Sequence, residues 1–339
     1  MKALHVPQHG GIEVLRYGDL PEPAVEPGWV KLRVRAAALN HLDLFACRGM
    51  PGIRIPMPHV PGSDCVGEIV ELGSGVEGWV EGQRVLVYPP FVDYSKGIVE
   101  IMGENRAGAL AEYCVARASQ LMPLPPGVSD EQAVSLPTAY GTAHRMLFVR
   151  TQIRRGETVL VLGASGGVGN AVVLLAKLAG ARVIAVAGSD EKCAHLRRLG
   201  ADETVNHRSE AFDAYVRRTT GSMLRGGGCD VVVNFTGGET WAPSLRCVKR
   251  GGRLLTCGAT AGFDPRTDIR YIFMGEISIL GSTGWQMEDQ RAVLDMVAQG
   301  RLDPPVAAVL ALSDGVAAFR MLEGRDFFGK IVLKPGVSA

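Results

Sequence analysis

Thr158-Val-Leu-Val-Leu162 runs directly into Gly163-Ala-Ser-Gly166-Gly167-Val168-Gly169, and an apolar helical pattern follows as far as Leu178. A strand, a glycine turn and a helix in this order bring backbone N–H groups and the positive helix end toward a pyrophosphate. A second strand pattern, Arg182–Ala187, begins about 20 residues after the first, as this kind of site requires. The stretch therefore predicts a dinucleotide site that uses Ser165, Gly166, Gly167 and Val168. The alternative is that the glycines only close a tight turn.

The end of the second strand indicates which dinucleotide is bound. It reads Ala187-Gly188-Ser189, where an enzyme that uses NAD would place an acid on the ribose 2′-hydroxyl. No acid stands there, and cationic and hydroxyl groups can instead gather on a 2′-phosphate. The sequence therefore favours NADP, bound by Gly188, Ser189, Lys192, His207 and Arg208. Two alternatives stay open: Asp190 or Glu191 could reach the ribose, and the cations could be ordinary surface residues.

Strand and helix patterns alternate from about residue 131 onward. Further strands are expected at residues 230–234, 253–256 and 277–280. This alternation predicts an α/β fold, a doubly wound parallel sheet with helices on both faces. Ligands bind at the carboxyl ends of such strands, so the turns after the last two should line the nicotinamide end of the groove. These turns contain Gly258, Ala259, Ser282 and Thr283.

The first 130 residues have a different texture, with short β-like runs broken by glycine and proline. The runs cover residues 30–37, 65–72, 84–87 and 110–116 and predict an antiparallel, barrel-like region. After Gly284 come a helix, a Pro304-Pro305 break, a second helix and a strand at 330–334. That tail is too short to fold alone, so it should pack on the first region. The predicted domains are residues 1–130 with 286–339, and residues 131–285.

Composition excludes several classes of protein. The 339 residues suit two domains with a cleft, and 36 basic against 35 acidic residues give a net charge of +1. This balance argues against nucleic acid or a membrane surface as a partner and favours a small-molecule substrate. The seven cysteines are scattered without a CxxC pair, which suits a reducing compartment. With neither a signal peptide nor an apolar membrane-spanning run, a cytoplasmic location is expected.

Four segments carry a resemblance to a known family. They are Ala36-Ala-Ala-Leu-Asn40-His41-Leu-Asp43, Pro61-Gly-Ser63-Asp64-Cys-Val-Gly-Glu68, Leu136-Pro-Thr138-Ala-Tyr-Gly-Thr142 and Phe328-Gly-Lys330-Ile-Val-Leu333. With the glycine turn and the carboxy-terminal return, the chain resembles the medium-chain dehydrogenase/reductase superfamily along nearly all its length. The resemblance implies a β-rich, GroES-like catalytic domain beside a Rossmann domain.

The chain departs from the zinc alcohol dehydrogenases of this superfamily at each zinc position. Asn40 stands in place of the first catalytic cysteine and Ser63 in place of the histidine, and no cysteine occurs around Val134 and Ser135. Residues 88–108, where a four-cysteine structural-zinc lobe would lie, also contain no cysteine. Zinc needs thiolate, imidazole or carboxylate ligands, so no metal is expected. A metal recruited by His59, Asp64 and Cys65 is the alternative.

Asn40 matches instead the zinc-independent branch, which is similar to quinone oxidoreductases and enoyl or alkenal reductases. This resemblance implies NADPH-dependent hydride transfer to a quinone or an α,β-unsaturated carbonyl compound. It also implies that His41, Thr138 and Lys330 contact the cofactor, and that Asp43 and Asp64 are structural hydrogen-bond acceptors. A homodimer is expected, because the strand at 277–280 would pair with its twofold mate.

Asn40 and Tyr88 are the predicted catalytic residues, as hydrogen-bond donors to the substrate oxygen. Tyr88 follows the strand at 84–87 and is expected to point toward the cleft, although a packing role is an equal alternative. Phe45 stands where some members of the branch have a tyrosine, so no proton donor is assigned. Two other functions stay open: an NADPH-binding, crystallin-like protein with little catalysis, and a carbonyl reductase without zinc.

Overall fold

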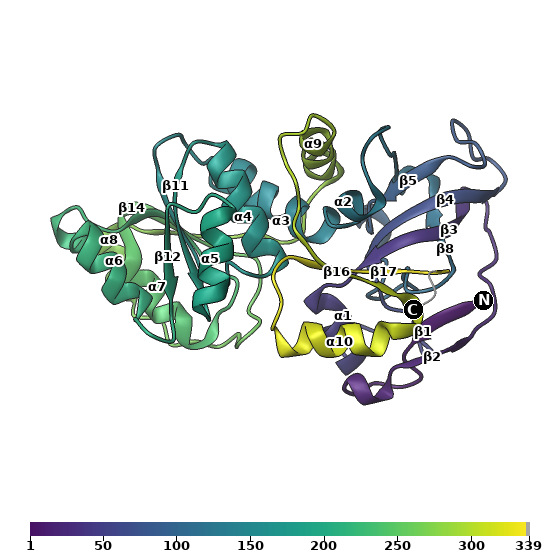
Figure 1. The fold of residues 1–339 in the computed structure, drawn as a ribbon, viewed down its shortest axis with the longest axis horizontal. Coiled ribbons are helices and arrows are strands. Elements are labelled where there is room, and N and C mark those ends of the chain that lie inside the picture. Colours follow the sequence, from purple (N-terminus) through teal and green to yellow (C-terminus); the bar gives the residue numbers. More distant parts are fainter. Residues whose placement is uncertain (337–339) are drawn as a thin grey trace. The chain divides into compact units, whose positions relative to one another are not determined.

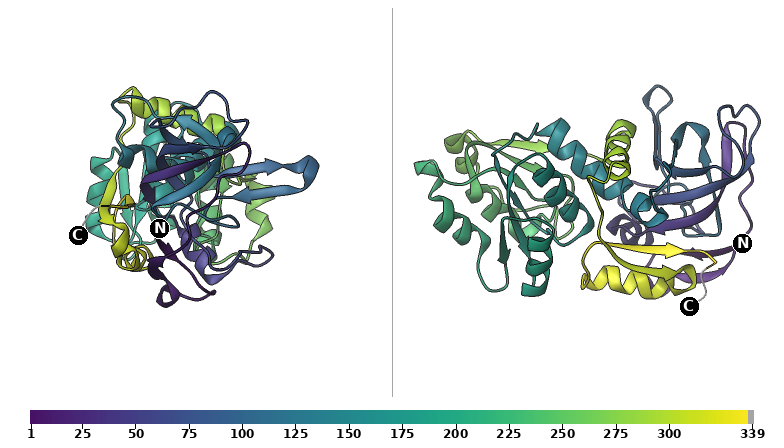
Figure 2. Two further views of the ribbon diagram at one scale, coloured as in Figure 1. Left: turned by 90° about the vertical axis from the view of Figure 1, so that its right-hand side faces the viewer. Right: turned by 45° about the horizontal axis from the view of Figure 1, so that its top comes forward.

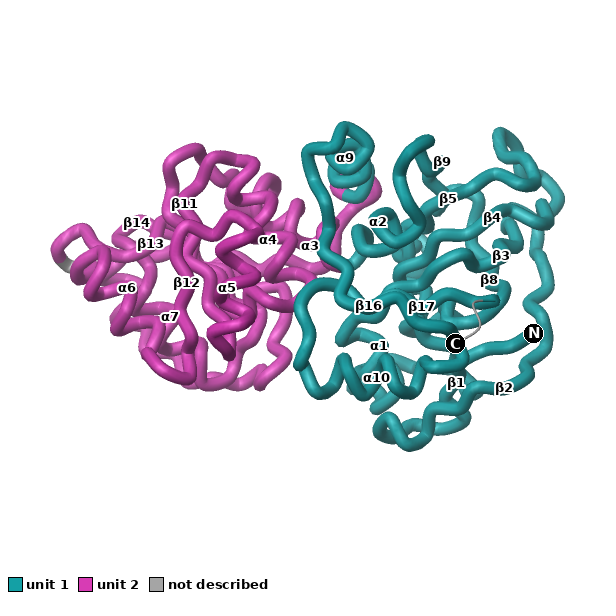
Figure 3. Tube along the Cα trace, in the orientation of Figure 1, with its two compact units in different colours: residues 1–138, 290–339 teal, residues 139–289 magenta. Residues whose placement is uncertain are grey.

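The computed structural model describes residues 1–336 and divides the chain into two compact units (Figure 3). Unit 1 comprises Met1–Thr138 and Gln290–Ala339, and unit 2 comprises Ala139–Asp289. The chain therefore passes from unit 1 to unit 2 after Thr138 and returns after Asp289. The last three residues of the predicted domain range lie outside the described residues.

Unit 2 is built on a six-stranded sheet with the order β12-β11-β10-β13-β14-β15, and every neighbouring pair is parallel. The central strands are apolar nearly throughout, as expected for a parallel sheet that is buried on both faces. This confirms the predicted doubly wound fold. The strands are β10 (Thr158–Val161), β11 (Arg182–Ala187), β12 (Glu203–Asn206), β13 (Cys229–Val233), β14 (Val248–Thr256) and β15 (Ser278–Gly281).

Helices cover both faces of this sheet, with α4 and α5 on one side and α6, α7 and α8 on the other (Figure 1). Their bounds are α4 (Gly167–Leu178), α5 (Asp190–Arg198), α6 (Phe212–Thr220), α7 (Trp241–Cys247) and α8 (Ile269–Gly275). The segment that enters unit 2 contains two π-helical turns on either side of the short helix α3 (Thr142–His144): η4 (Pro137–Gly141) and η5 (Arg145–Arg150). Such turns are rare and often lie at functional sites.

Unit 1 contains a seven-stranded sheet in which β17 pairs with β3, so the carboxy-terminal segment joins the amino-terminal strands. The order is β16-β17-β3-β4-β5-β9, and β8 also pairs with β3. The sequence analysis missed β16, which runs parallel to β17 just after the Pro304-Pro305 break. The strands are β3 (Trp29–Ala38), β4 (Asp64–Leu72), β5 (Arg84–Val87), β8 (Tyr113–Arg117), β9 (Leu121–Pro123), β16 (Val306–Ala311) and β17 (Lys330–Lys334).

Two smaller strand pairs complete unit 1: β1 (Lys2–His5) with β2 (Arg16–Asp19), and β6 (Pro90–Asp93) with β7 (Ile98–Ile101). The β6–β7 hairpin projects from the rest of the unit (Figure 2). The helices are α1 (His41–Arg48), α2 (Asp130–Val134), α10 (Gly315–Gly324) and α9 (Met287–Ala298), which spans the unit boundary. None of the helices in residues 1–336 has the length and apolar character that a membrane span requires.

Candidate functional site

Three of the four glycines in the glycine turn of unit 2 have different tasks. Gly163, at the end of β10, has a φ of 64°, which an L side chain rarely adopts. A Cβ built on Gly166 would meet only the Gly163 carbonyl oxygen, at 3.7 Å, so the backbone before α4 is open to a ligand. A Cβ on Gly169 would lie 2.4 Å from that oxygen and 2.6 Å from Ala164 Cα. Gly169 therefore lets α4 pack closely against the strand.

This division of tasks predicts opposite outcomes for two matched substitutions. Gly169→Ala should lower the free energy of unfolding by about 1–3 kcal/mol, because its methyl meets backbone that cannot move aside. Gly166→Ala should leave the melting temperature nearly unchanged but weaken binding of the nicotinamide dinucleotide, because its methyl occupies the open approach to the helix end. Thermal unfolding and cofactor titration of both variants test this. Equal stability of the two variants would contradict the assignment.

The ends of β11 and β12 bring together most of the residues predicted to bind a 2′-phosphate. A Cβ on Gly188 would lie 3.2 Å from His207 Nε2 and 3.8 Å from Arg208 Nε, so both side chains gather around this glycine. Ser189 Oγ accepts a hydrogen bond from the Lys192 backbone N–H at 3.2 Å and begins α5. These side chains and the adjacent helix end fit an anionic group.

Asp190, one of the two acids that could have bound an NAD ribose, is already engaged. Asp190 Oδ1 accepts a hydrogen bond from Asn206 Nδ2 at 2.9 Å, while Asn206 Oδ1 accepts one from the Arg208 N–H at 3.1 Å. Asn206 thus ties the acid to the loop that carries the cation. The arrangement gives Asp190 a structural partner and weakens the alternative in which it reaches the ribose.

The carboxyl ends of β14 and β15 also carry the predicted residues. Gly258 and Ala259 line a pocket of about 340 Å³ together with Trp241 and Phe263. Ser282 is 9% exposed, and within residues 1–336 its buried Oγ has no hydrogen-bond partner. Thr283 is exposed. An orphaned hydroxyl at the carboxyl end of a parallel strand fits a polar ligand such as the nicotinamide carboxamide.

In unit 1, Asn40 lies where β3 ends and α1 begins, in a buried polar cluster. Its Nδ2 donates to Asp64 Oδ2 at 2.9 Å, and its Oδ1 accepts from Lys330 Nζ at 2.6 Å. Thr138 donates to Asp64 Oδ1 through its backbone N–H at 3.0 Å and its hydroxyl at 2.6 Å. The strands β3, β4 and β17 therefore bring together predicted residues that are up to 290 positions apart in the sequence.

Lys330 belongs to the same buried polar cluster. The residue is 3% exposed, and its ammonium donates to the Leu39 carbonyl at 2.9 Å, to Asn40 Oδ1 and to Asp64 Oδ2 at 3.1 Å. An ammonium has three protons, and all three have acceptors here. This placement argues against the predicted pyrophosphate contact, because a phosphate would have to replace a partner that is itself buried.

Burial also shifts the pKa values of Asp43 and His41, which lie on the first turn of α1. Asp43 Oδ2 accepts from the Asn40 N–H at 2.7 Å and Oδ1 from the Gly62 N–H at 2.8 Å, so the carboxyl fixes the start of the helix. Burial raises the pKa of Asp43 to about 7, although these two hydrogen bonds oppose the shift. Burial, with the charges of Arg325, Lys330 and Arg48, lowers the pKa of His41 to about 4. A neutral imidazole can offer a cofactor one N–H but no charge.

Tyr88 is half-buried and its backbone is held by Gln120, a residue that the sequence analysis did not single out. Gln120 Nε2 donates to the carbonyl oxygens of Tyr88, Pro89 and Pro90 at 3.0–3.3 Å. Val87 and Pro89, on either side of Tyr88, line a pocket of about 540 Å³ under the β6–β7 hairpin, but Tyr88 does not. No sequence motif marks Gln120, because the carbonyl groups that it binds belong to residues far from it in the sequence.

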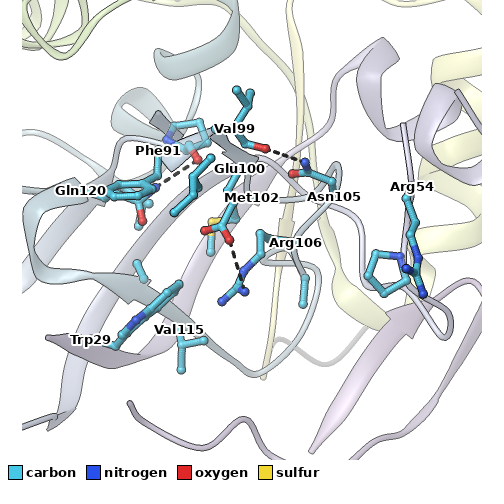
Figure 4. Close-up of a pocket in the computed structure, with 17 residues that line it drawn as sticks. Trp29, Arg54, Phe91, Val99, Glu100, Met102, Asn105, Arg106, Val115 and Gln120 are labelled. Atoms are coloured by element: carbon cyan, nitrogen blue, oxygen red, sulfur yellow. Dashed lines mark hydrogen bonds and ion pairs between the residues drawn. The ribbon is translucent and has the colours of Figure 1, made fainter. Parts of the chain in front are cut away.

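The wall of this pocket includes Trp29, Phe91 and the ion pair of Glu100 with Arg106 (Figure 4), and Arg117 stacks on both rings. The guanidinium carbon of Arg117 lies 4.4 Å from the ring centre of Trp29 and 4.0 Å from that of Phe91. Glu100 pairs with Arg117 at 2.9 Å and with Arg106 at 3.6 Å. These contacts anchor the β6–β7 hairpin, in the segment where a zinc alcohol dehydrogenase would have its cysteine lobe.

The residues at the zinc positions do not fit a zinc ion. Asn40 is bound to Asp64 and Lys330, and Ser135 Oγ donates to the Glu131 carbonyl at 2.7 Å. Ser63 is fully buried and offers only a hydroxyl. Amide and hydroxyl groups are not the thiolate, imidazole or carboxylate ligands that zinc takes. Within residues 1–336, no group of three or more His, Cys, Asp or Glu side chains is placed to hold a metal.

Sequence comparisons agree with this architecture. The family model described as alcohol dehydrogenase GroES-like domain matches residues 26–126, and the model described as zinc-binding dehydrogenase matches residues 167–299. A quinone oxidoreductase-like protein 2 from Bos taurus is 30% identical over 92% of this chain and 86% of its own length. An acryloyl-coenzyme A reductase from Metallosphaera sedula is 33% identical over 98% of this chain and 99% of its own.

Solved structures share the fold along almost the whole chain. An NAD-dependent alcohol dehydrogenase superposes with a TM-score of 0.92 and 38% identity, covering 99% of this chain and 100% of that one. A 2-octenoyl-CoA carboxylase reductase in complex with NADP and 2-octenoyl-CoA gives 0.87 and 30%, covering 98% and 87%. These comparisons confirm the predicted GroES-like and Rossmann domains. The chain belongs to the medium-chain dehydrogenase/reductase superfamily, within its quinone oxidoreductase-like branch.

Proposed function

We propose that this protein is an NADPH-dependent reductase of quinones or α,β-unsaturated carbonyl compounds that works without zinc. The observation that carries the proposal is the Asn40 cluster: the position of a catalytic zinc ligand holds an amide clamped between Asp64 and Lys330. The names of the relatives, a quinone oxidoreductase-like protein and an acryloyl-coenzyme A reductase, support this substrate class.

We assign the cofactor site to unit 2. The open backbone at Gly166 accepts the pyrophosphate, and His207 and Arg208 beside Gly188 accept the 2′-phosphate. Ser189 and Lys192 extend this site, and Ser282 with the Gly258-Ala259 turn lies at its nicotinamide end. One structural neighbour is NAD-dependent, but its name does not outweigh the cations and the engaged Asp190 of this chain. NADPH, when bound, supplies the hydride.

The residues of unit 1 stabilise the charge that develops on the substrate. A substrate that no metal polarises must already be electrophilic, and conjugation achieves this by spreading negative charge onto a distant oxygen. Asn40 Nδ2 donates a hydrogen bond to that oxygen, with Tyr88 as a second donor. Thr138 fixes the nicotinamide, and because its hydroxyl proton is committed to Asp64 it does so as an acceptor. The last proton comes from solvent.

A substrate panel tests this function. Purified protein should oxidise NADPH with 1,4-benzoquinone or 2-hexenal and be inactive with cyclohexanone, because a saturated ketone needs a Lewis acid or a proton donor at its oxygen and neither is assigned in this chain. Metal analysis of the same sample should find far less than one zinc per chain. Brisk ketone reduction without enone or quinone activity, or one essential zinc per chain, would contradict the proposal. NADPH binding without turnover of any acceptor would favour a crystallin-like binding protein.

We also propose a cytoplasmic homodimer formed through β15. This strand is at the edge of the unit 2 sheet, and Ile279 on it is 37% exposed. On α8, which precedes β15 in the chain, Ile269 and Phe273 are 66% and 65% exposed, so unit 2 has further exposed apolar side chains that a partner could cover. Light scattering at micromolar concentration should give a dimer, and Ile279→Lys should give a monomer. A monomeric parent protein would refute the prediction.

A further inference from the structure

We infer that Lys330 is a positioning residue that fixes the orientation of the Asn40 amide, and that it is not a ligand of the cofactor pyrophosphate. This inference rests on the proposed function, since it gives Lys330 a task in the reaction proposed for Asn40. It departs from the role that the family resemblance implies. Four side chains form the cluster in which Lys330 lies: Asn40, Asp64, Thr138 and Lys330 itself.

All hydrogen-bonding positions of the ion pair between Lys330 and Asp64 are occupied. Lys330 Nζ has three acceptors, and Asp64 accepts four hydrogen bonds, two on each oxygen. A carboxylate offers about four lone-pair positions, so neither group has capacity left. Asp64 is fully buried and Lys330 is 3% exposed. Moving the ammonium to a phosphate would leave a buried carboxylate without its counter-charge, which is strongly unfavourable.

The charged partners of the Asn40 amide determine which of its two ends is the oxygen and which is the nitrogen. An ammonium can only donate, so the atom 2.6 Å from Lys330 Nζ must be the carbonyl oxygen Oδ1. A carboxylate can only accept, so the atom 2.9 Å from Asp64 Oδ2 must be the amide nitrogen Nδ2. The two charged partners therefore allow one orientation of the amide. Without Lys330, the amide would keep only the partners of Nδ2, and its Oδ1 would lose the charged donor that fixes it.

The clamped amide can still donate one hydrogen bond to a substrate. Nδ2 has two protons, and one is given to Asp64. The other faces the Ala38 carbonyl at 3.4 Å, a long and weak hydrogen bond that a substrate oxygen can replace. Asn40 is thus a donor held ready, and the cost of orienting it is met during folding rather than during the reaction.

The test is Lys330→Met, which removes the ammonium but keeps the length of the side chain. Titration of NADPH without substrate should give a dissociation constant within about twofold of the parent, whereas loss of a charge-assisted phosphate contact would weaken binding about tenfold or more. Turnover of the best acceptor should fall at least about tenfold, because the amide loses its fixed orientation. Tenfold weaker NADPH binding would overturn the inference.

A double-mutant cycle separates positioning from general structural damage. In an Asn40→Ala background, Lys330→Met should lower turnover no further, because the amide it orients is already gone. An equal further loss would overturn the inference. Lys334→Met is the matched control: it lies on the same strand, pairs with Glu131 at 2.6 Å and should leave binding and turnover unchanged.

The test stays decisive if the variant does not fold or if the parent protein is inactive. If Lys330→Met does not fold, the double variant Lys330→Met/Asp64→Asn removes both buried charges together, and its NADPH affinity decides the question by the same limits. If the parent protein turns over no acceptor, the proposed function fails. The NADPH titration still decides whether Lys330 is a cofactor ligand, so the two failures can be told apart.

Discussion

Asn40→Ala should lower the turnover of an enone or quinone about 10²–10³-fold, because a single donor aimed at a developing oxyanion contributes this much. Asn40 is only 8% exposed, and a hydrogen bond to a charged oxygen is strong at such a buried position. The cofactor site assigned to unit 2 is untouched. NADPH affinity, measured by titration, should therefore stay close to that of the parent.

Asn105→Ala is a suitable control for this substitution. Asn105 is also an asparagine of unit 1, but its side chain bonds to the backbone of Ile101 and Val99 on β7. Its loss should loosen the hairpin and leave turnover largely intact. If both variants lose turnover equally, or if Asn40→Ala loses NADPH affinity in proportion to turnover, Asn40 does not have the role proposed here.

Arg208→Ala should weaken NADPH binding about tenfold or more while leaving NADH binding nearly unchanged, because a charge-assisted contact contributes about 1.5–3 kcal/mol. The Arg208 guanidinium lies beside Gly188 at the end of β11, and the 2′-phosphate is the part of NADPH that NADH lacks. Lys192→Ala should act in the same direction. Parallel titrations of the two cofactors measure the difference.

Arg198→Ala is the matched control for the cofactor prediction. Arg198 is an exposed arginine at the end of α5 in the same unit, and its guanidinium donates to His195 Nδ1 at 2.9 Å. Its removal changes the net charge equally but should not change the preference for NADPH. A parent protein that binds both cofactors with equal affinity would refute the assignment before any variant is made.

Unit 2 could be predicted closely because its signals are local. Each central strand is a short run of buried aliphatic residues, and the glycine turn after β10 sets the first crossover. The predicted strand at 182–187 has the observed bounds of β11. The predicted ligand residues at the ends of β11 and β12 also meet in space, because the carboxyl ends of parallel strands lie at one edge of a sheet.

Unit 1 was harder, because its site is made by pairing between distant segments. The cluster joins β3, β4 and β17, and the register that seats Lys330 beside Asn40 is not visible in either segment alone. The strand β16 (Val306–Ala311) was missed since three of its six residues are alanine, which is a weak strand former. The β6–β7 hairpin was missed because proline and glycine interrupt its short apolar runs.

The most direct test of the central claim follows the hydride. The protein, freed of metal by chelation, is incubated with 2-hexenal and NADPH carrying deuterium at the transferred position, and the product is analysed by NMR and mass spectrometry. Reduction of a conjugated acceptor without zinc predicts hexanal with the deuterium on the former β-carbon. An unsaturated alcohol with the deuterium on the former carbonyl carbon, or activity that returns only when zinc is added, would contradict it.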